Sequence, residues 1–333
     1  MSSQSTINQA VSEQELSKVT DIINRIASQY HSNIIGQDHL LQSMLVTLLA
    51  GGNMLLEGVP GLAKTRAVKT LSSMMNASFK RIQFTPDLLP SDVVGNQVFN
   101  PKTSEFTVRK GPIFANIVLA DEINRAPGKV QSALLESMQE KQVTIGGETF
   151  TLPRPFMVLA TQNPIEQEGT YTLPEAQVDR FLIKHIVSYP SYEEEMSILN
   201  LIEGSQEIST KNVVNLEEIL SLQELVDKVY IDASLKHYIT SLVFATRNPG
   251  SHGLTDLGQV ISFGASPRAT LAFMKGAKAV ALLNGRHYVI PEDIKSLRYE
   301  ILRHRIVLSY EAQADGVQNE QVIERIFQTI QVP

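Results

Sequence analysis

The sequence contains no cysteine. Disulfide bonds, catalysis by a thiolate and cysteine-ligated zinc sites are therefore excluded. The 7 histidines are scattered along the chain and form no H-E-x-x-H pattern. Since that pattern is what places two histidines on one helix face to bind zinc, we assign no histidine to a metal.

An excess of positive charge is also missing. The formal net charge is −6 over 333 residues, so the chain as a whole has no electrostatic attraction to nucleic acid, although a local basic patch stays possible. A hydrophobic content of 43% and a charged content of 19% are typical of a globular protein. We therefore expect a globular protein, with two domains suggested by its length and no nucleic-acid partner.

Long apolar runs are scarce as well. The stretch between Asp38 and Glu57 carries no Asp, Glu, Lys or Arg, but Gln42, Ser43 and the segment 51–53 interrupt it. A helix, a turn and a strand explain this stretch better than a membrane span, which needs about 20 mostly apolar residues. The first ten residues show no basic segment followed by an apolar core, so we find no signal peptide. We expect a cytoplasmic protein without a membrane span.

Short apolar segments alternate with helical patterns up to Pro190. The expected strands lie within residues 53–58, 79–84, 116–122, 156–162 and 180–190. This alternation indicates an α/β fold with a doubly wound, mostly parallel, five-stranded sheet, in which ligands bind beyond the carboxyl ends of the strands. Two hairpin-like insertions, at residues 96–111 and 142–152, interrupt the alternation.

Helical patterns dominate after Pro190. They cover residues 191–202, 215–230, 233–247, 266–285 and 319–330, and the Gly/Ser-rich stretch 248–258 is expected to be a loop. We therefore predict an α/β domain over residues 1–190 and a smaller all-α domain over residues 191–333.

The segment GVPGLAKT, from Gly58 to Thr65, follows an expected strand and precedes an expected helix. In that setting backbone N–H groups and the helix dipole can hold an anion. Gly58 and Gly61 would allow the bend, Lys64 would reach terminal phosphates, and the Thr65 hydroxyl would hold Mg²⁺. The usual pattern has glycine before the lysine, where this chain has Ala63. We expect Ala63 to have entered the helix already, where alanine causes no strain.

Further chemical groups follow the later strands. Asp121 and Glu122 end one strand, where they could bind Mg²⁺ and deprotonate a water, or could be ordinary solvated acids. The next strand brings Thr161 and Asn163 to the same edge of the sheet, although Asn–Pro is also a common turn opener. Arg180 suits phosphate, or a salt bridge with a neighbouring acid.

The last group is the segment from Ser266 to Arg268. Ser266 and Pro267 suit the start of a helix. Arg268 then lies at the positive end of the helix dipole, where an anion nearby would offset the charge; the alternative is an exposed arginine.

Taken in order, GVPGLAKT, VLADEINRAP, ATQNP, EAQVDRF and SPRA resemble the AAA+ ATPases of the MoxR family, in which alanine before the lysine is usual. The resemblance covers nearly the whole chain from residue 34 onward, and it implies a P-loop NTPase core with an α-helical lid. It implies that ATP and Mg²⁺ are the cofactors, with Asp121 and Thr65 as metal ligands. It implies catalytic roles for Glu122 (Walker B), Asn163 (sensor 1), Arg180 (arginine finger) and Arg268 (sensor 2). The implied nucleotide-binding residues are Ile35, Gly36, Gln37, Gly58, Val59, Pro60, Gly61, Leu62, Ala63, Lys64, Thr65 and Arg66.

The resemblance also implies a function. Family members hydrolyse ATP and remodel protein complexes, often for maturation or for metal or cofactor insertion. They form rings, most often hexamers, and commonly work with a separate partner that carries a von Willebrand factor A domain. The two hairpins resemble the helix-2 and pre-sensor-1 inserts of this branch. The alternatives are a magnesium-chelatase motor subunit, a DNA-linked helicase or regulator, and a scaffold that binds ATP without turnover.

Overall fold

The computed structural model describes residues 11–164, 169–203 and 210–333. Contacts divide the chain into two compact units. The core unit is Arg25–Leu220, and the helical unit is Met1–Asn24 together with Ser221–Pro333. Two helices, α1 (Glu13–Asn33) and α8 (Leu216–Lys228), cross the division between the units. The domain boundary expected at residue 190 stays a prediction.

The core unit contains a five-stranded sheet in the order β2-β5-β8-β1-β9. All neighbouring strands pair in parallel, as the alternation of strands and helices predicts. The strands are β2 (Phe79–Gln83), β5 (Ile117–Asp121), β8 (Met157–Gln162), β1 (Met54–Glu57) and β9 (Ile183–Ile186). The central strands are apolar and buried on both sides, since helices cover both faces of the sheet.

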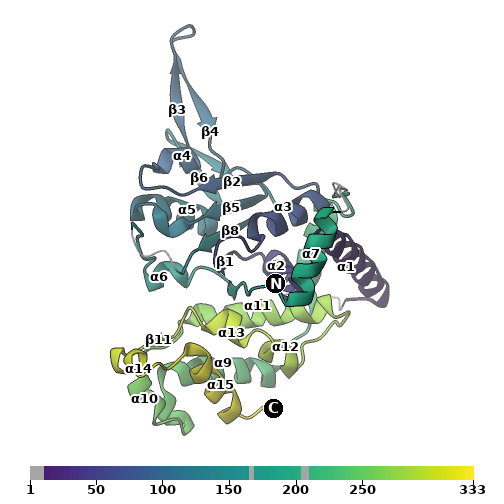
Figure 1. Cartoon of the computed structure of the whole chain (residues 1–333), viewed down its shortest axis with the longest axis vertical. Coiled ribbons are helices and arrows are strands. Elements are labelled where there is room, and N and C mark those ends of the chain that lie inside the picture. The colour runs from purple at the N-terminus through teal and green to yellow at the C-terminus, as the bar shows by residue number, and fades with distance from the viewer. Residues whose placement is uncertain (1–10, 165–168, 204–209) are drawn as a thin grey trace, which may run out of the picture. The chain divides into compact units, whose positions relative to one another are not determined.

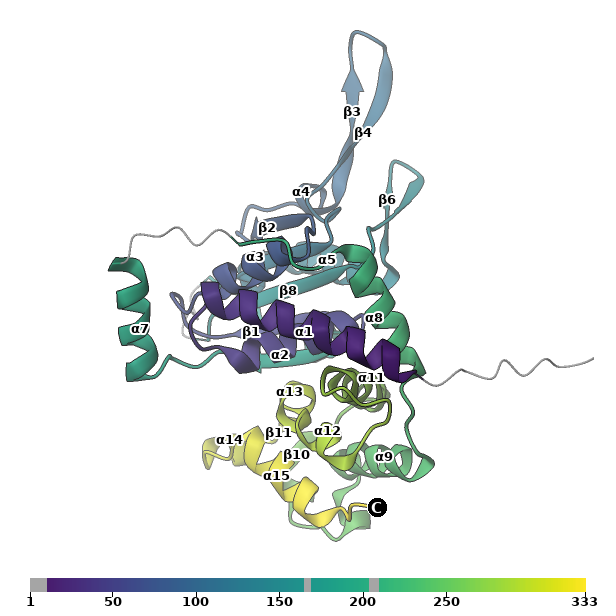
Figure 2. The ribbon, with the colours of Figure 1, turned by 90° about the vertical axis from the view of Figure 1, so that its right-hand side faces the viewer.

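Each face of the sheet has its own helices (Figures 1 and 2). Leu134 and Met138 of α5 (Gly128–Glu140) form one buried cluster with Val118 and Val158 of the sheet. The opposite face is covered by α2 (Asp38–Leu49) and α3 (Lys64–Met74). The remaining helices of this unit are α4 (Pro90–Val94), η1 (Ile123–Arg125), α6 (Glu175–Val178) and α7 (Tyr192–Glu203).

Buried polar residues stand directly before the strands, at the amino edge of the sheet. Asn116 precedes β5; its Oδ1 accepts hydrogen bonds from the Ser78 N–H at 3.1 Å and the Ser78 hydroxyl at 2.7 Å. Its Nδ2 donates to the Pro155 carbonyl at 2.9 Å. Asn53 precedes β1, and its Oδ1 accepts from the Val158 N–H at 2.8 Å. These side chains therefore tie neighbouring strands together where the strands begin.

Both predicted insertions are hairpins. The first pairs β3 (Gly95–Asn100) with β4 (Glu105–Lys110), and the second pairs β6 (Gln142–Ile145) with β7 (Glu148–Thr151). Both project from the sheet on the same side (Figure 2). Near the end of the first hairpin, Phe99 and Phe106 lie opposite each other with ring centroids 5.3 Å apart. The hairpins meet where the Gln97 amide donates to the Gly146 carbonyl at 3.5 Å.

The helical unit is built mainly from α9 (Ala233–Arg247), α11 (Pro267–Leu283) and α15 (Asn319–Thr329). Its shorter elements are η2 (Pro249–His252), α10 (Leu257–Val260), β10 (Ile261–Phe263), α12 (Pro291–Lys295), α13 (Arg298–Leu302), β11 (Val307–Leu308) and α14 (Tyr310–Ala314). The stretch 248–258, expected to be a loop, is partly helical because it contains η2 and the start of α10. The Arg286 guanidinium forms two hydrogen bonds with the buried Asp293 carboxylate, at 2.8 and 2.5 Å. Among the described residues, no helix is long and apolar enough to span a membrane.

Candidate active site

The segment Gly58–Ala63 joins β1 to α3 and is the predicted strand–loop–helix. Lys64 is the first residue of α3, and Ala63 directly before it has φ 54° and ψ 17°. The expectation that Ala63 has entered the helix is therefore wrong. Gly61, two residues earlier, also has a positive φ, 90°, so the chain turns into α3 through two such residues. A left-handed residue with a Cβ costs roughly 1–2 kcal/mol, so this loop holds backbone strain.

The Lys64 side chain folds back over the loop, and its ammonium donates a hydrogen bond to the Gly58 carbonyl. Burial lowers the pKa of Lys64, while the nearby carboxylates of Asp121, Glu122 and Glu57 act in the opposite direction. The lysine is therefore partly desolvated and faces negative charge, an environment in which phosphate oxygens would favour its charged form.

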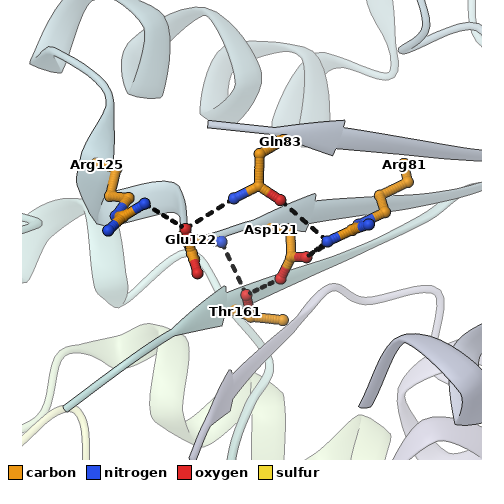
Figure 3. A network of polar contacts seen from close by, with 6 residues as sticks. All are labelled: Arg81, Gln83, Asp121, Glu122, Arg125 and Thr161. Atoms are coloured by element: carbon orange, nitrogen blue, oxygen red, sulfur yellow. Dashed lines mark hydrogen bonds and ion pairs between the residues drawn. The ribbon is translucent and has the colours of Figure 1, made fainter. Parts of the chain in front are cut away.

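Asp121 is the last residue of β5, and its side chain is only 13% exposed. Its Oδ1 accepts a hydrogen bond from the Thr161 hydroxyl at 2.6 Å. Its Oδ2 accepts from Arg81 Nε at 3.0 Å and from a terminal Arg81 nitrogen at 2.5 Å. The carboxylate is thus held from both neighbouring strands, β8 and β2 (Figure 3).

Glu122 follows Asp121 and is left-handed, at φ 56° and ψ 51°. Its N–H donates to the Thr161 hydroxyl oxygen at 2.8 Å. Its Oε2 accepts from the Gln83 amide at 2.7 Å and lies 3.2 Å from an Arg125 nitrogen. The backbone turn directs this side chain away from the strand, and Gln83 and Arg125 fix its position (Figure 3).

These groups share one cavity of about 400 Å³. Its lining residues are Pro60, Gly61, Leu62, Ala63, Lys64, Thr65, Arg66, Arg81, Asp121, Glu122, Thr161, Gln162 and Asn163. The cavity lies beyond the carboxyl ends of β1, β5 and β8, where an open parallel sheet binds its ligands. Gly58 and Val59, also expected to bind the nucleotide, are not among its lining residues, and Gly58 contributes its carbonyl to Lys64.

A second cavity of about 310 Å³ adjoins the first, because Pro60, Gly61, Leu62, Ala63 and Arg66 line both. Its lining adds Ile35 and Gln37, both expected to bind the nucleotide, and apolar side chains such as Ile198 and Leu201. Gly36 does not line this cavity; a Cβ there would collide with the Glu194 carboxylate, which lies 1.9 Å from its position. The cation Lys64 in the first cavity and the apolar side chains of the second suit a ligand with an anionic end and an apolar end.

Two predicted arginines, Arg180 and Arg268, are not among the residues that line these cavities. Arg180 follows α6, is exposed, and donates a hydrogen bond to the Leu135 carbonyl at 3.4 Å. Arg268 is the second residue of α11 in the helical unit and is also exposed. Ser266 caps that helix as predicted, since its hydroxyl accepts from the Arg268 N–H at 3.1 Å.

A magnesium ion at this site would be bound by oxygens of the protein together with oxygens of the substrate and of water. Among residues 11–164, 169–203 and 210–333, no group of three or more His, Asp or Glu side chains could hold a metal ion. Mg²⁺ does not need one, since it commonly binds one or two protein oxygens together with substrate phosphates and waters. Thr65 and Asp121 line the same cavity and fit that requirement.

Arg81, Gln83 and Arg125 were not predicted from the sequence as residues of the site. Arg81 and Gln83 stand two residues apart on β2 and so point to the same face of that strand. They reach Asp121 and Glu122 because β2 pairs with β5, with Gln83 in register with Asp121. The spacing of Arg81 and Gln83 indicates that they share one face of a strand. Only the order of the strands in the sheet shows which carboxylates they contact.

Two family models match the chain. Residues 53–183 match "ATPase family associated with various cellular activities (AAA)", and residues 255–326 match "AAA lid domain". The first match contains the whole 400 Å³ cavity lining.

Similar proteins and a solved structure agree with these matches. The chain is 50% identical to "Chaperone MoxR1" of Mycobacterium tuberculosis over 90% of this chain and 79% of that protein. It is 48% identical to the protein YeaC of Bacillus subtilis over 96% and 95% of the two chains. The crystal structure of a protein assigned as an ATPase, from Cytophaga hutchinsonii, superposes with a TM-score of 0.91 at 47% identity, covering 96% of this chain and 98% of that one.

Proposed function

Because this chain belongs to the MoxR family of AAA+ ATPases, we propose that it couples Mg²⁺-dependent ATP hydrolysis to the remodelling of client protein complexes. The chain is an ATPase. The observation that carries the proposal is the single cavity that holds Lys64, Asp121, Glu122 and Asn163 together. The similarity to a chaperone supports protein complexes as the class of client.

The residues that line the cavity have separate roles in the proposed phosphoryl transfer. Backbone N–H groups of the loop and the Lys64 ammonium bind the phosphates of ATP. Thr65 and Asp121 would hold Mg²⁺, which would neutralise charge on the phosphate oxygens. Glu122 orients the attacking water and accepts its proton, and the Asn163 amide hydrogen-bonds the water or the terminal phosphate.

Arg180 serves a neighbouring subunit in this proposal. It is exposed and does not line the cavity of its own chain, which suits a side chain that completes another subunit's site in a ring, as a hexamer would provide. An arginine supplied in this way contributes roughly 10³–10⁵ in rate. Arg268 is proposed to contact the nucleotide from the lid.

Mixing two inactive variants tests the ring. Arg180→Ala subunits keep Glu122, and Glu122→Gln subunits keep Arg180, so a mixed ring contains some complete sites. We expect ATPase activity to reappear on mixing and to depend on the ratio of the variants. If Arg180 acted within its own chain, every mixture would stay inactive.

The clients and partners are proposed by class. The two hairpins are the parts that would contact a client, whose maturation could include metal or cofactor insertion, together with a separate partner that carries a von Willebrand factor A domain in the cytoplasm. A tagged Glu122→Gln variant should retain ATP and hold such proteins during purification. Lys64→Ala, which should bind little nucleotide, is the matched control. Equal sets of co-purifying proteins from both variants would contradict nucleotide-dependent client binding.

A further inference from the structure

Arg81 has no role in the machinery described above, yet it holds the carboxylate assigned to the metal (Figure 3). We infer that Arg81 competes with Mg²⁺ for Asp121: it occupies Asp121 before the metal–nucleotide complex binds and has to move for the metal to take its place. The inference rests on the proposed Mg²⁺–nucleotide function of the cavity.

The competition follows from the number of contacts that one carboxylate can make. Each carboxylate oxygen has about two lone-pair sites. Two Arg81 nitrogens, at 3.0 and 2.5 Å, use those of Asp121 Oδ2, and the Thr161 hydroxyl uses one on Oδ1. A metal ion or its bound water at Oδ2 therefore needs the oxygen that the guanidinium now holds. At Oδ1 a metal ion would still lie close to an arginine of like charge.

The position of Arg81 is specified by the fold. A terminal Arg81 nitrogen also donates to the Gln83 side-chain oxygen at 3.0 Å, and Gln83 in turn donates to Glu122 at 2.7 Å. The guanidinium is thus held by an acceptor on its own strand and by Asp121 on the next. Lys80, the adjacent cation, points to the opposite face of β2, because neighbouring side chains of a strand alternate.

Release of Arg81 leaves the hydrophobic core intact. Its side chain is 50% exposed, and β2 is an edge strand of the sheet. Asp121 is mostly buried and would be left without its cationic partner when Arg81 moves. A metal ion would then supply the positive charge that Arg81 had supplied. Arg81 thus keeps the buried carboxylate paired, at the expense of metal affinity.

The experiment compares the affinity for a fluorescent ADP analogue in EDTA and in excess Mg²⁺. The dissociation constant in EDTA divided by the dissociation constant in Mg²⁺ measures how much the metal strengthens nucleotide binding. The measurement needs no turnover. In Arg81→Gln we expect this ratio to rise about fivefold, equivalent to about 1 kcal/mol, the upper range for a partly exposed ion pair. Lys80→Gln removes the same charge from the same strand and should leave the ratio unchanged.

The outcomes separate this inference from the proposed function. A ratio above one in the wild type that stays equal or falls in Arg81→Gln would overturn the competition and assign Arg81 to nucleotide binding or to stability. A ratio of one in the wild type would instead contradict the proposed Mg²⁺ site. Arg81→Lys, which keeps the charge but loses the fork, should give an intermediate rise and replaces Arg81→Gln if that variant unfolds at lower temperature.

Discussion

The two edges of the parallel sheet use similar polar residues for opposite purposes. At the amino edge, the groups of Asn53, Asn116 and Ser78 make hydrogen bonds that tie neighbouring strands together. At the carboxyl edge, Asp121 and Glu122 face a cavity of about 400 Å³, and the backbone at Glu122 and Ala63 is left-handed. The difference teaches that a polar residue at a strand end becomes a candidate for chemistry when it faces open space from a strained backbone.

The largest effect is expected at the carboxyl edge. Glu122→Gln removes the proposed base but keeps the shape, so the ATPase rate constant should fall about 10²–10⁴-fold, a range typical of general-base loss. Steady-state phosphate release and urea unfolding would be measured together, and the unfolding free energy should change little. Glu136→Gln, on the exposed side of α5, is the control. A Glu122→Gln enzyme as fast as the wild type would favour a scaffold or another base.

The next effect is expected at the amino edge. Asn116→Ala leaves the Ser78 N–H and the Pro155 carbonyl without their partner, and should lower the unfolding free energy by about 2–4 kcal/mol. Urea unfolding measures the loss, and ADP affinity under native conditions should be retained. Asn96→Ala, on the exposed face of β3, is the control. Loss of ADP binding by a folded Asn116→Ala protein would contradict the division between the edges.

A smaller effect concerns protons. Because burial lowers the pKa of Lys64, the free protein loses this proton at a lower pH than an ordinary lysine with a pKa of 10.5. Bound phosphates favour the charged form, so the pKa of Lys64 should be higher in the nucleotide complex than in the free protein. At pH values between these two pKa values, nucleotide binding should take up a proton. Nucleotide affinity should fall as the pH rises through that range. Calorimetry in two buffers of different ionisation enthalpy measures the uptake. The uptake should vanish at pH values well below the lowered pKa, where Lys64 is charged with or without nucleotide. The absence of uptake at every pH would show that phosphates leave the pKa of Lys64 unchanged.

The smallest effect is expected at Ala63. Glycine relieves the left-handed strain but gains freedom in the unfolded chain, so Ala63→Gly should leave stability unchanged or raise it by up to about 1 kcal/mol, with ADP binding retained. Thermal unfolding and ADP titration check both. The same substitution at Ala27, inside α1, should lower stability by about 1 kcal/mol. Equal destabilisation at both positions would mean that Ala63 is not strained.

The comparison also separates what the sequence predicts from what it does not. Apolar segments followed by polar residues predict the strands, both hairpins and the gathering of Lys64, Asp121 and Glu122 at one edge. The chain order of the strands does not give their order in the sheet, so the contact of Arg81 with Asp121 was not predicted. The conformation of Ala63 was missed for a different reason: it depends on how the turn closes between a fixed strand and a fixed helix, and not on the residue itself.

The contact between the two hairpins has a practical consequence. Gln97 reaches the Gly146 carbonyl, and a Cβ at residue 146 would lie 2.0 Å from the Gln97 amide, so this contact depends on the absence of a side chain at residue 146. Because the chain has no cysteine, one cysteine introduced on each hairpin would give the protein its only thiols. A spectroscopic label pair or a reversible disulfide at these positions would then report whether the hairpins move as one body or separate during each cycle of hydrolysis.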